Sequence, residues 1–418
     1  MATGISGSGR LAAMPAVPTT TTRPEIDLID PGFYQADPHP AYTWMRFNEP
    51  LYRDEPNGLW GVTRHADVLE VERNSATFVS GRGYRSWGSP EENNIISLDD
   101  PAHLAQRRLV SNRFTPRAVR DQETWLRSVI DDLLDPVTAR GGELDVIDDL
   151  AAQLPCRLTA KLLGFPEDRW ADIKRWSERL MRIDVVPTDG DAFVAFLETI
   201  NELATLLGEV VPERRGCPMD DLLSIWASAD IDGNHGYTED RMVNEVGLFI
   251  AGGAETTRTV IAHGLRVFAD HPDQWDLLVE RPEAITTAVE ELIRWVTPLN
   301  NFFRTAVADA TIGGRPVAEG DRIILLYPSA NRDEDVFVDP FRFDVTRSPN
   351  PHVAFGHGTH FCIGANLARF ELQLLFAEMA RRFRAPEVLT EPVVEPNVFA
   401  RSVRSFQARL EPRASVAG

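Results

Sequence analysis

The chain has 418 residues, of which 43% are hydrophobic and 25% charged, and its formal net charge is −20. This length and composition allow a large buried core, and the negative charge argues against general binding of nucleic acids. The three cysteines, Cys156, Cys217 and Cys362, are too few and too scattered for a disulfide framework or a zinc site. The protein is therefore expected in the reducing cytoplasm.

The two ends of the chain differ in composition from the rest. Residues 1–24 are rich in Ala, Thr, Gly, Ser and Pro, which favours a disordered N-terminal tail over a signal sequence. A second short tail is expected over 413–418. No apolar run reaches the ~18 residues that a membrane-spanning helix needs, so no membrane span is expected.

The first predicted elements are short and lead into a loop. Residues 38–47 predict the first short helix, and the alternation around Gly58 predicts a β-hairpin over 51–62. Residues 80–95 are polar, rich in glycine and without periodicity. They predict a loop that is long enough to have a function of its own.

A helix is predicted directly after this loop. Asp100 can act as its N-cap, and Pro101 suits the first helical position. His103 and Arg107 are four residues apart and share one face, but spacing alone fits an ordinary solvated face equally well. This region is basic in an otherwise acidic chain, because it contains Arg108, Arg113, Arg117 and Arg120. The positive charge is either ordinary surface charge or a docking patch for an acidic protein.

The centre of the chain is predicted to be helical. Over 125–201 breaks are expected at Pro136, Gly141-Gly142, Pro155, Pro166 and Pro187. Residues 238–270 form the longest helical pattern, interrupted by Gly252 and Gly253. Each glycine costs about 1 kcal/mol relative to alanine inside a helix. The pair therefore indicates either a close helix contact or an opening of the hydrogen-bond ladder.

The C-terminal third mixes helices and strands. A helix over 282–295 carries Glu291 and Arg294 three residues apart, a spacing that fits a solvated ion pair. Strands are expected over 299–306 and 311–327, the latter with a Gly313-Gly314 turn. An amphipathic helix over 365–383 and a closing hairpin over 397–410 complete the chain.

The segment 355–364 places Cys362 in a run with three glycines and two histidines, directly before the helix over 365–383. A lone cysteine is most often a small buried hydrophobe. Here backbone amides and the helix N-terminus can hold a negative sulfur, and the glycines leave room for a flat group. The pattern Phe-x-x-Gly-x-His-x-Cys-x-Gly resembles the haem-binding loop of cytochromes P450, in which the Cys thiolate ligates iron.

Three further regions resemble the same family in the same order. They are His103 with Arg107, the segment 251–257, and Glu291 with Arg294. The resemblance covers about residues 30–410 and is to bacterial cytochromes P450 of the soluble, ferredoxin-dependent type. It implies a single domain over 25–412 that is mainly α with a smaller β region. Haem b would lie between the long central helix and the Cys-loop helix.

The resemblance also implies the roles of individual residues. Glu255 and Thr256 would be catalytic and manage protons, and Cys362 would ligate the iron. Glu291 and Arg294 would form a buried structural network, completed by Arg342. The other haem contacts implied are His103, Arg107, Arg304, His360, Ala251, Gly252, Phe355 and Gly364. The loop over 80–95 would cover the substrate, residues 178–200 would form the roof of the pocket, and residues 299–303 and 397–400 would line it. The predicted substrate contacts are Ile96, Leu248, Asn300, Phe302, Val398 and Phe399.

The implied reaction inserts one oxygen atom from O2 into a C–H bond of an apolar small molecule. Two electrons would come from NAD(P)H through a separate ferredoxin reductase and ferredoxin. Residues 99–114, 273–278 and 358–362 resemble actinobacterial members that oxidise sterol side chains. A sterol or steroid is therefore expected as substrate, with a polyketide, terpene or other secondary metabolite as the alternative.

Two other classes of haem-thiolate protein are disfavoured by the same residues. A peroxide-driven enzyme would be expected to carry an Arg-Pro pair where this chain has Glu255 and Thr256. A non-catalytic haem sensor would need no acid–alcohol pair, and no regulatory domain is visible in the sequence.

Overall fold

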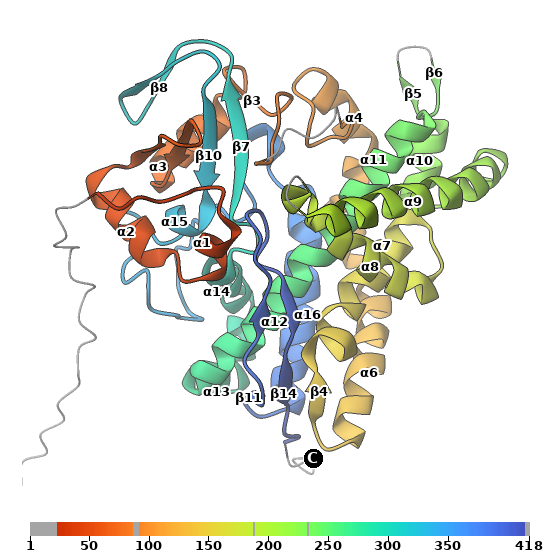
Figure 1. The fold of residues 1–418 in the computed structure, drawn as a ribbon. Coiled ribbons are helices and arrows are strands. Elements are labelled where there is room, and N and C mark those ends of the chain that lie inside the picture. Colours follow the sequence, from red (N-terminus) through yellow and green to blue (C-terminus); the bar gives the residue numbers. More distant parts are fainter. Residues whose placement is uncertain (1–22, 87–91, 187–188, 232–233, 414–418) are drawn as a thin grey trace, which may run out of the picture.

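Figure 1 shows a computed structural model that describes residues 23–86, 92–186, 189–231 and 234–413. The tails predicted over 1–24 and 413–418 lie outside this part of the chain except for residues 23, 24 and 413. The single domain over 25–412 stays a prediction. The five-stranded sheet and the first helices lie on the left of Figure 1, and most of the longer helices lie on the right.

Helices make up most of the described chain. Their bounds are α1 Pro31–Gln35, α2 His39–Asn48, α3 His65–Arg73, α4 Ala102–Val110, α5 Pro116–Arg120, α6 Glu123–Ala139, α7 Gln153–Leu163, α8 Trp170–Met181, α9 Gly190–Gly216, α10 Leu222–Ser228, α11 Glu239–Ile250, α12 Thr256–Asp270, α13 Pro272–Glu280, α14 Ile285–Val296, α15 Tyr327–Ala330 and α16 Ala365–Arg382.

The strands form one larger sheet and several small ones. The larger sheet has the order β1-β2-β10-β7-β3, in which only β2 and β10 run parallel. A small sheet joins β11, β14 and β4. The strands are β1 Leu51–Asp54, β2 Leu59–Val62, β3 Phe78–Val79, β4 Glu143–Asp145, β5 Asp230–Ile231, β6 Asn234–His235, β7 Asn301–Ala306, β8 Ala310–Ile312, β9 Arg315–Val317, β10 Arg322–Leu326, β11 Glu387–Val388, β12 Val393–Val394, β13 Val403–Ser405 and β14 Gln407–Arg409.

The predicted long helix is present and contains a local change of hydrogen bonding. α11 continues through the π-helical segment η5 (Ala251–Glu255) into α12. Both interpretations of the glycine pair hold. A Cβ on Gly253 would lie 2.8 Å from the hydroxyl of Thr159 in α7, so the helices approach closely there, whereas a Cβ on Gly252 would meet open space. The widened turn is typical of functional sites.

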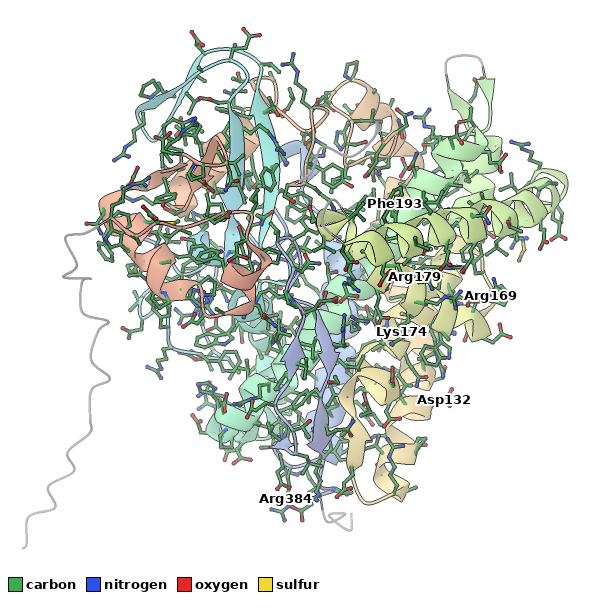
Figure 2. The ribbon with its side chains drawn as sticks, in the orientation of Figure 1. Asp132, Arg169, Lys174, Arg179, Phe193 and Arg384 are labelled. Atoms are coloured by element: carbon green, nitrogen blue, oxygen red, sulfur yellow. The ribbon has the colours of Figure 1, made fainter. Side chains whose placement is uncertain are left out.

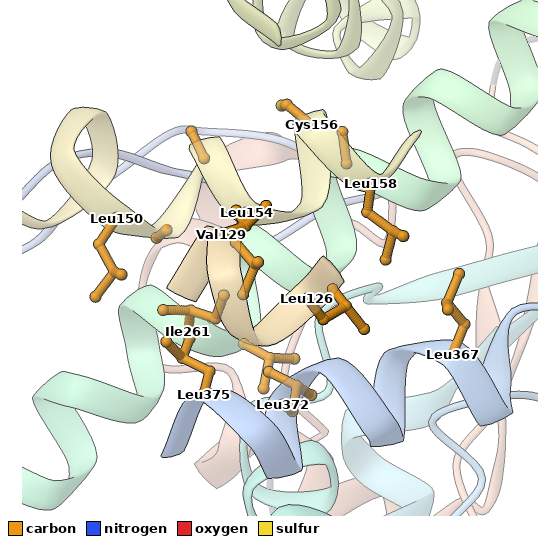
Figure 3. Packing of buried hydrophobic residues seen from close by; sticks show 14 of the residues in the cluster. Leu126, Val129, Leu150, Leu154, Cys156, Leu158, Ile261, Leu367, Leu372 and Leu375 are labelled. Atoms are coloured by element: carbon orange, nitrogen blue, oxygen red, sulfur yellow. The ribbon is translucent and has the colours of Figure 1, made fainter. Parts of the chain in front are cut away.

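The main hydrophobic core lies between α6, α7, α12 and α16. Figure 3 shows Leu126 and Val129 of α6 meeting Ile261 of α12 and Leu372 and Leu375 of α16. Each of these side chains is at most 2% exposed. Burying one such aliphatic side chain contributes about 1.5–3 kcal/mol, so this cluster fixes α16 and α12 relative to each other.

Several predicted boundaries were wrong for local reasons. Pro136 lies within the last turn of α6 and Pro155 within the first turn of α7, so neither proline ends a helix. The N-cap of α4 is Pro101 rather than Asp100, whose carboxylate instead contacts Nδ1 of His103 at 3.0 Å. The closing hairpin pairs β12 with β13, while β14 pairs with β4 and β11.

The buried Glu291–Arg294 pair has a different third member from the predicted Arg342. Glu291 and Arg294 are fully buried, with a separation of 2.7 Å, and Nε of Arg347 lies 3.0 Å from Glu291. The side chain of Arg342 is exposed, and only its carbonyl accepts hydrogen bonds from Arg294 and Arg347. Arg294 also donates to the carbonyl of Asn331, whose side chain accepts from the amide of Val353, just before the Cys loop.

Candidate active site

One cavity of about 440 Å³ brings the predicted Cys loop and the π-helical segment together. Its surface is mostly apolar, which suits a hydrophobic molecule. Cys362 lines it, as do Thr256 and Arg304. The other predicted haem contacts that line it are Arg107, His360, Ala251, Gly252, Phe355 and Gly364.

The Cys loop is held by its own backbone and by α3. The amide of Cys362 donates to the carbonyl of Phe355 at 2.9 Å, which closes the loop. Gly358 has φ +69°, and a Cβ there would lie 2.3 Å from the carbonyl oxygen of Glu72. Only glycine therefore allows the loop to lie against α3 at this point.

Cys362 lines the cavity and is exposed to it. Desolvation by the surrounding protein raises the pKa of the Cys362 thiol, while the backbone N–H groups of Gly364 and Ala365 and the charge of Arg107 oppose the rise. α16 begins at Ala365, so the positive end of its dipole also points toward the sulfur. These donors suit a thiolate that is bound to a metal ion.

Cationic and imidazole groups from three separate elements gather beside the loop. Arg107 of α4 donates through Nη2 to the carbonyl of Phe361, and Arg304 of β7 donates to the carbonyl of Phe303 at 2.8 Å. The ring of His360 lies 4.2 Å from that of His103, measured between centroids. Burial, together with the charge of Arg304, lowers the pKa of His360 to about 3, so its imidazole is neutral.

Thr256 and Glu255, the predicted acid–alcohol pair, lie in different environments. The hydroxyl of Thr256 lines the cavity and donates to the carbonyl of Gly252 at 2.7 Å. Glu255 is 1% exposed, does not line the cavity, and pairs with Arg258 at 2.7 Å. Arg258 in turn pairs with Glu178 of α8 at 2.6 Å. Burial raises the pKa of Glu255, and the charge of Arg258 opposes that rise.

The Glu255–Arg258–Glu178 chain leads toward the surface. Nζ of Lys174 lies 3.0 Å from the Glu178 carboxylate. Figure 2 shows Lys174 and Arg179 on the outer side of α8. A carboxylate beside the π-helical segment is therefore linked by ion pairs to groups in contact with solvent.

The predicted substrate contacts fall into two groups. Four line the cavity: Ile96, Leu248, Phe302 and Phe399. Asn300 and Val398 do not line it, and their contact with a substrate stays a prediction. The side-chain amide of Asn300 donates to the carbonyl of Val398 at 3.1 Å, and Val398 packs in a core cluster with Tyr34 and Tyr42. Both residues shape the turn that carries Phe399 rather than the cavity surface.

Sequence reasoning missed several residues of the upper cavity. Arg85 lies in the loop predicted to be functional, but no spacing or motif distinguishes it from its neighbours. Met181 and Phe196 come from the predicted roof segment 178–200, where only their apolar character was a signal. Glu371 of α16 also lines the cavity, and burial raises its pKa to about 8.

The chain is similar to a known protein family, to proteins of known activity and to solved structures. The model of the family "Cytochrome P450" matches residues 274–400. A steroid C26-monooxygenase of Mycobacterium tuberculosis is 37% identical over 90% of this chain and 94% of its own length. Linalool 8-monooxygenase of Pseudomonas putida is 32% identical, over 93% of this chain and 99% of its own length.

This chain belongs to the cytochrome P450 family. A Mycobacterium marinum P450 in complex with pseudoionone has the same fold, with a TM-score of 0.85 and 32% identity, covering 93% of this chain and 100% of that one. The P450 is an oxidoreductase, a monooxygenase whose cofactor is haem. Within the described residues, no helix combines the length and apolarity needed to cross a membrane.

The residues around the cavity fit this haem. Among the described residues, neither Arg107 nor Arg304 forms an ion pair with a carboxylate. Arg304 is only 5% exposed. Two cations are therefore available for the two propionates of haem. Nε2 of His103 is buried without a hydrogen-bond partner in the described chain. The open space beside Gly252 leaves room for a flat group between η5 and the Cys loop.

Proposed function

We propose that this P450 hydroxylates a C–H bond of a steroid or sterol, using O2 and two electrons delivered by a ferredoxin. The observation that carries the proposal is the apolar cavity of about 440 Å³ that is bordered by both Cys362 and Thr256. Support for the substrate class comes from three relatives named steroid C26-monooxygenase, two from Mycobacterium tuberculosis strains and one from Mycolicibacterium smegmatis, at 36–38% identity.

A terpenoid substrate is the second candidate. Linalool 8-monooxygenase is named for a terpenoid reaction, and pseudoionone, the ligand in the Mycobacterium marinum complex, is a compound of the same chemical class. The aromatic side chains of Phe302 and Phe399, whose ring centroids lie 5.0 Å apart, offer flat apolar surface to either class.

In this proposal the chain's own residues bind and orient the cofactor. When bound, the haem supplies the iron centre at which dioxygen is reduced and activated. Cys362 would ligate the iron from one side, and Arg107 and Arg304 would hold the two propionates by charge-assisted hydrogen bonds. His360, supported by the ring of His103, would complete the propionate contacts. Ala251 and Gly252 would border the space left for substrate on the other side.

Proton delivery would depend on Thr256 and Glu255 in different ways. The Thr256 hydroxyl reaches the cavity and can turn between the Gly252 carbonyl and a reacting oxygen. Glu255 would supply the proton-carrying carboxyl, and Arg258, which itself stays protonated, would hold that carboxyl in place and link it to Glu178. Thr256→Ala should divert most of the NAD(P)H consumed away from product, whereas Thr256→Ser should keep the coupling. Equal coupling in all three proteins would contradict this role.

Electron delivery would use the basic surface of α4 and α5. Arg108, Arg117 and Arg120 are exposed there, and Arg113 pairs with Asp220. This surface is tied to elements next to the sulfur. Arg107 of α4 bonds the carbonyl of Phe361, and the side chain of Asn366 donates to the carbonyl of Phe114, in the turn between α4 and α5, at 3.1 Å. An acidic ferredoxin bound here would lie close to Cys362, and opposite charges would speed its association.

A cytoplasmic location is part of the proposal. Its support is that Cys156, Cys217 and Cys362, all within the described chain, are free thiols. A reducing compartment would keep Cys362 available for iron.

The decisive experiment measures ligand binding and turnover with the haem-loaded protein. Sterols, terpenoid alcohols and macrolides are titrated while the haem spin-state spectrum is recorded. Each compound that binds is then incubated with NADPH, O2 and a surrogate ferredoxin system. A hydroxylated steroid is the expected product. Binding and turnover of terpenoids alone would select the second candidate, and ligand binding without turnover would contradict a monooxygenase role on these compounds.

A further inference from the structure

A second cavity, separate from the active site, lies between α2, α12, α14 and the turn that carries Phe399. Its volume is about 180 Å³, about half of its surface is polar, and none of the described residues lines both cavities. The polar side chains that line it are those of His39, His263, Arg332 and Arg401, and no acidic residue of the described chain lines it. The cavity is therefore bordered by cations and imidazoles alone.

The two arginines carry charge that the protein does not neutralise. Within the described chain, neither Arg332 nor Arg401 forms an ion pair with a carboxylate. Glu291, whose charge reaches Arg332, is already paired with Arg294 and Arg347. Burial lowers the pKa of both Arg332 and Arg401, because their charged forms are poorly solvated. An arginine cannot relieve this cost by losing its proton, so a counter-charge is needed.

The histidines and the nearest acid do not supply that counter-charge. Burial lowers the pKa of His39 well below its ordinary value, and burial together with the charge of Arg401 lowers that of His263 to about 4. Both imidazoles are therefore neutral. Asp37 is exposed, and its charge acts on Arg401 without an ion pair. Water in the cavity can accept hydrogen bonds but cannot balance two positive charges.

Arg401 has one edge of its guanidinium free. Nη1 donates to the carbonyl of Val296 at 3.2 Å, whereas Nε and Nη2 have no hydrogen-bond partner among the described residues. Nε is buried, but Nη2 keeps accessible surface. Arg332 is 2% exposed and uses Nη1 and Nη2 on the carbonyls of Arg294 and Trp295, at 3.1 and 2.9 Å. Its charge thus stays beside the cavity while the free edge of Arg401 offers two parallel donors.

This donor geometry selects the kind of anion. The Nε and Nη2 edge of an arginine matches two oxygen atoms of one oxyanion, whereas a chloride ion presents a single centre. A water molecule occupies about 30 Å³ in the liquid, so the cavity has room for a phosphate-sized ion with some of its water.

We propose that this cavity binds one small inorganic oxyanion of the phosphate class, held by the free edge of Arg401 and by the charge of Arg332. The ion would tie α2, α12 and α14 to the turn that carries Phe399. The amide of Arg401 donates to the carbonyl of Pro298 at 3.0 Å, and Pro298 lines the active-site cavity. The anion site is thus directly behind one wall of the active site, yet it does not depend on which substrate is oxidised.

Isothermal titration calorimetry of the haem-loaded protein tests the site. The dialysed protein is first denatured in acid and assayed for released phosphate and sulfate, so that an ion retained from the cell is counted. Sodium phosphate is then titrated in a buffer that contains excess chloride. The expected result is saturable binding of one phosphate per chain, competed by sulfate. A hundredfold excess over the dissociation constant should raise the thermal midpoint by about 3 °C.

Variants assign the binding to this cavity. Arg401→Met should abolish it. Arg404→Met is the matched control in the same hairpin: that arginine is exposed and pairs with Glu395 at 2.6 Å, so its loss should leave phosphate binding unchanged. The spectrum of the reduced carbon monoxide complex verifies folding. If Arg401→Met does not fold, Arg401→Lys, which keeps the charge but lacks the two-donor edge, should weaken binding at least about tenfold.

Four outcomes would overturn the inference. They are no retained or saturably bound oxyanion in the parent protein, displacement of phosphate by equimolar chloride, unchanged binding after substitution of Arg401, and equal loss in the Arg401 and Arg404 variants. The last would assign the binding to general surface charge. None of these results bears on the steroid or terpenoid substrate, which turnover tests separately.

Discussion

The two ends of the cavity are built in different ways. At the Cys loop, backbone contacts within ten residues fix the geometry: the amide of Cys362 bonds the carbonyl of Phe355, and Gly358 lies against α3. At the upper end, three segments far apart in sequence meet through side chains. Arg85 reaches Asp184, and the side-chain amide of Asn397 donates to the carbonyl of Met181 at 3.0 Å.

This difference indicates that the Cys loop determines the reaction and that the upper end of the cavity determines which substrates bind. A group held by backbone geometry cannot move far without loss of the loop, so its environment is rigid. A roof held by individual side-chain bonds can change one contact at a time. Substitutions at the Cys loop should therefore remove the reaction, whereas those at the roof should change which molecules bind.

The largest expected effect is at the sulfur. Cys362→Ser should abolish the reduced carbon monoxide absorption band typical of a thiolate haem and lower turnover at least about 1000-fold, because a serine oxygen is a far weaker electron donor to iron. Cys217→Ser, an exposed cysteine outside the cavity, is the control and should keep the band. Survival of the band in Cys362→Ser would contradict the ligand assignment.

A smaller effect is expected behind the loop. Arg294→Met leaves Glu291 fully buried without its main partner and should lower the free energy of unfolding by about 3–5 kcal/mol. The loss should reach the Cys loop through Asn331 and Val353 and reduce haem retention. Arg342→Met should change stability by less than about 0.5 kcal/mol, because that side chain is exposed. Denaturant unfolding followed by far-UV circular dichroism measures both; equal losses would contradict the role of the network.

A third effect is expected at Glu245 in α11 and depends on pH. Burial raises the pKa of Glu245 in α11 to about 8, although Arg241 and the backbone amide of Ile95 oppose the rise. The folded protein therefore retains a proton that the unfolded chain releases above about pH 4.5. The free energy of unfolding should fall as pH rises toward about 8, by at most about 1.4 kcal/mol per pH unit from this group.

Glu245→Gln removes this titration, so its thermal midpoint should fall less than that of the parent protein between about pH 5 and about pH 8. Asp240→Asn, an exposed carboxylate in the first turn of the same helix, is the control and should follow the parent profile. Identical profiles for Glu245→Gln and the parent protein would show that the carboxyl is not held protonated in the fold.

The features that sequence reasoning predicted are those encoded by neighbouring residues. The Cys loop and the glycine pair before Glu255 each lie within about ten positions, so local geometry constrains them. The residues that sequence reasoning predicted wrongly or missed are those whose partners depend on how the chain folds between distant positions. Arg342 and Arg347 both follow Asp339, which has a left-handed φ of +46°, and only the fold determines that Arg347 faces Glu291. Arg85 is similar, because Asp184 is 99 residues away.

The turn at residues 395–402 has a consequence for the evolution of selectivity. Asn397 Oδ1 accepts from the amides of Phe399 and Ala400 at 2.7 and 3.0 Å, and Asn301 donates to the carbonyl of Val398 at 2.8 Å. None of these bonds uses the ring of Phe399. The turn can therefore keep its hydrogen bonds while that one side chain varies, so a single codon can remodel the cavity wall, at the cost of the packing that Phe399 supplies.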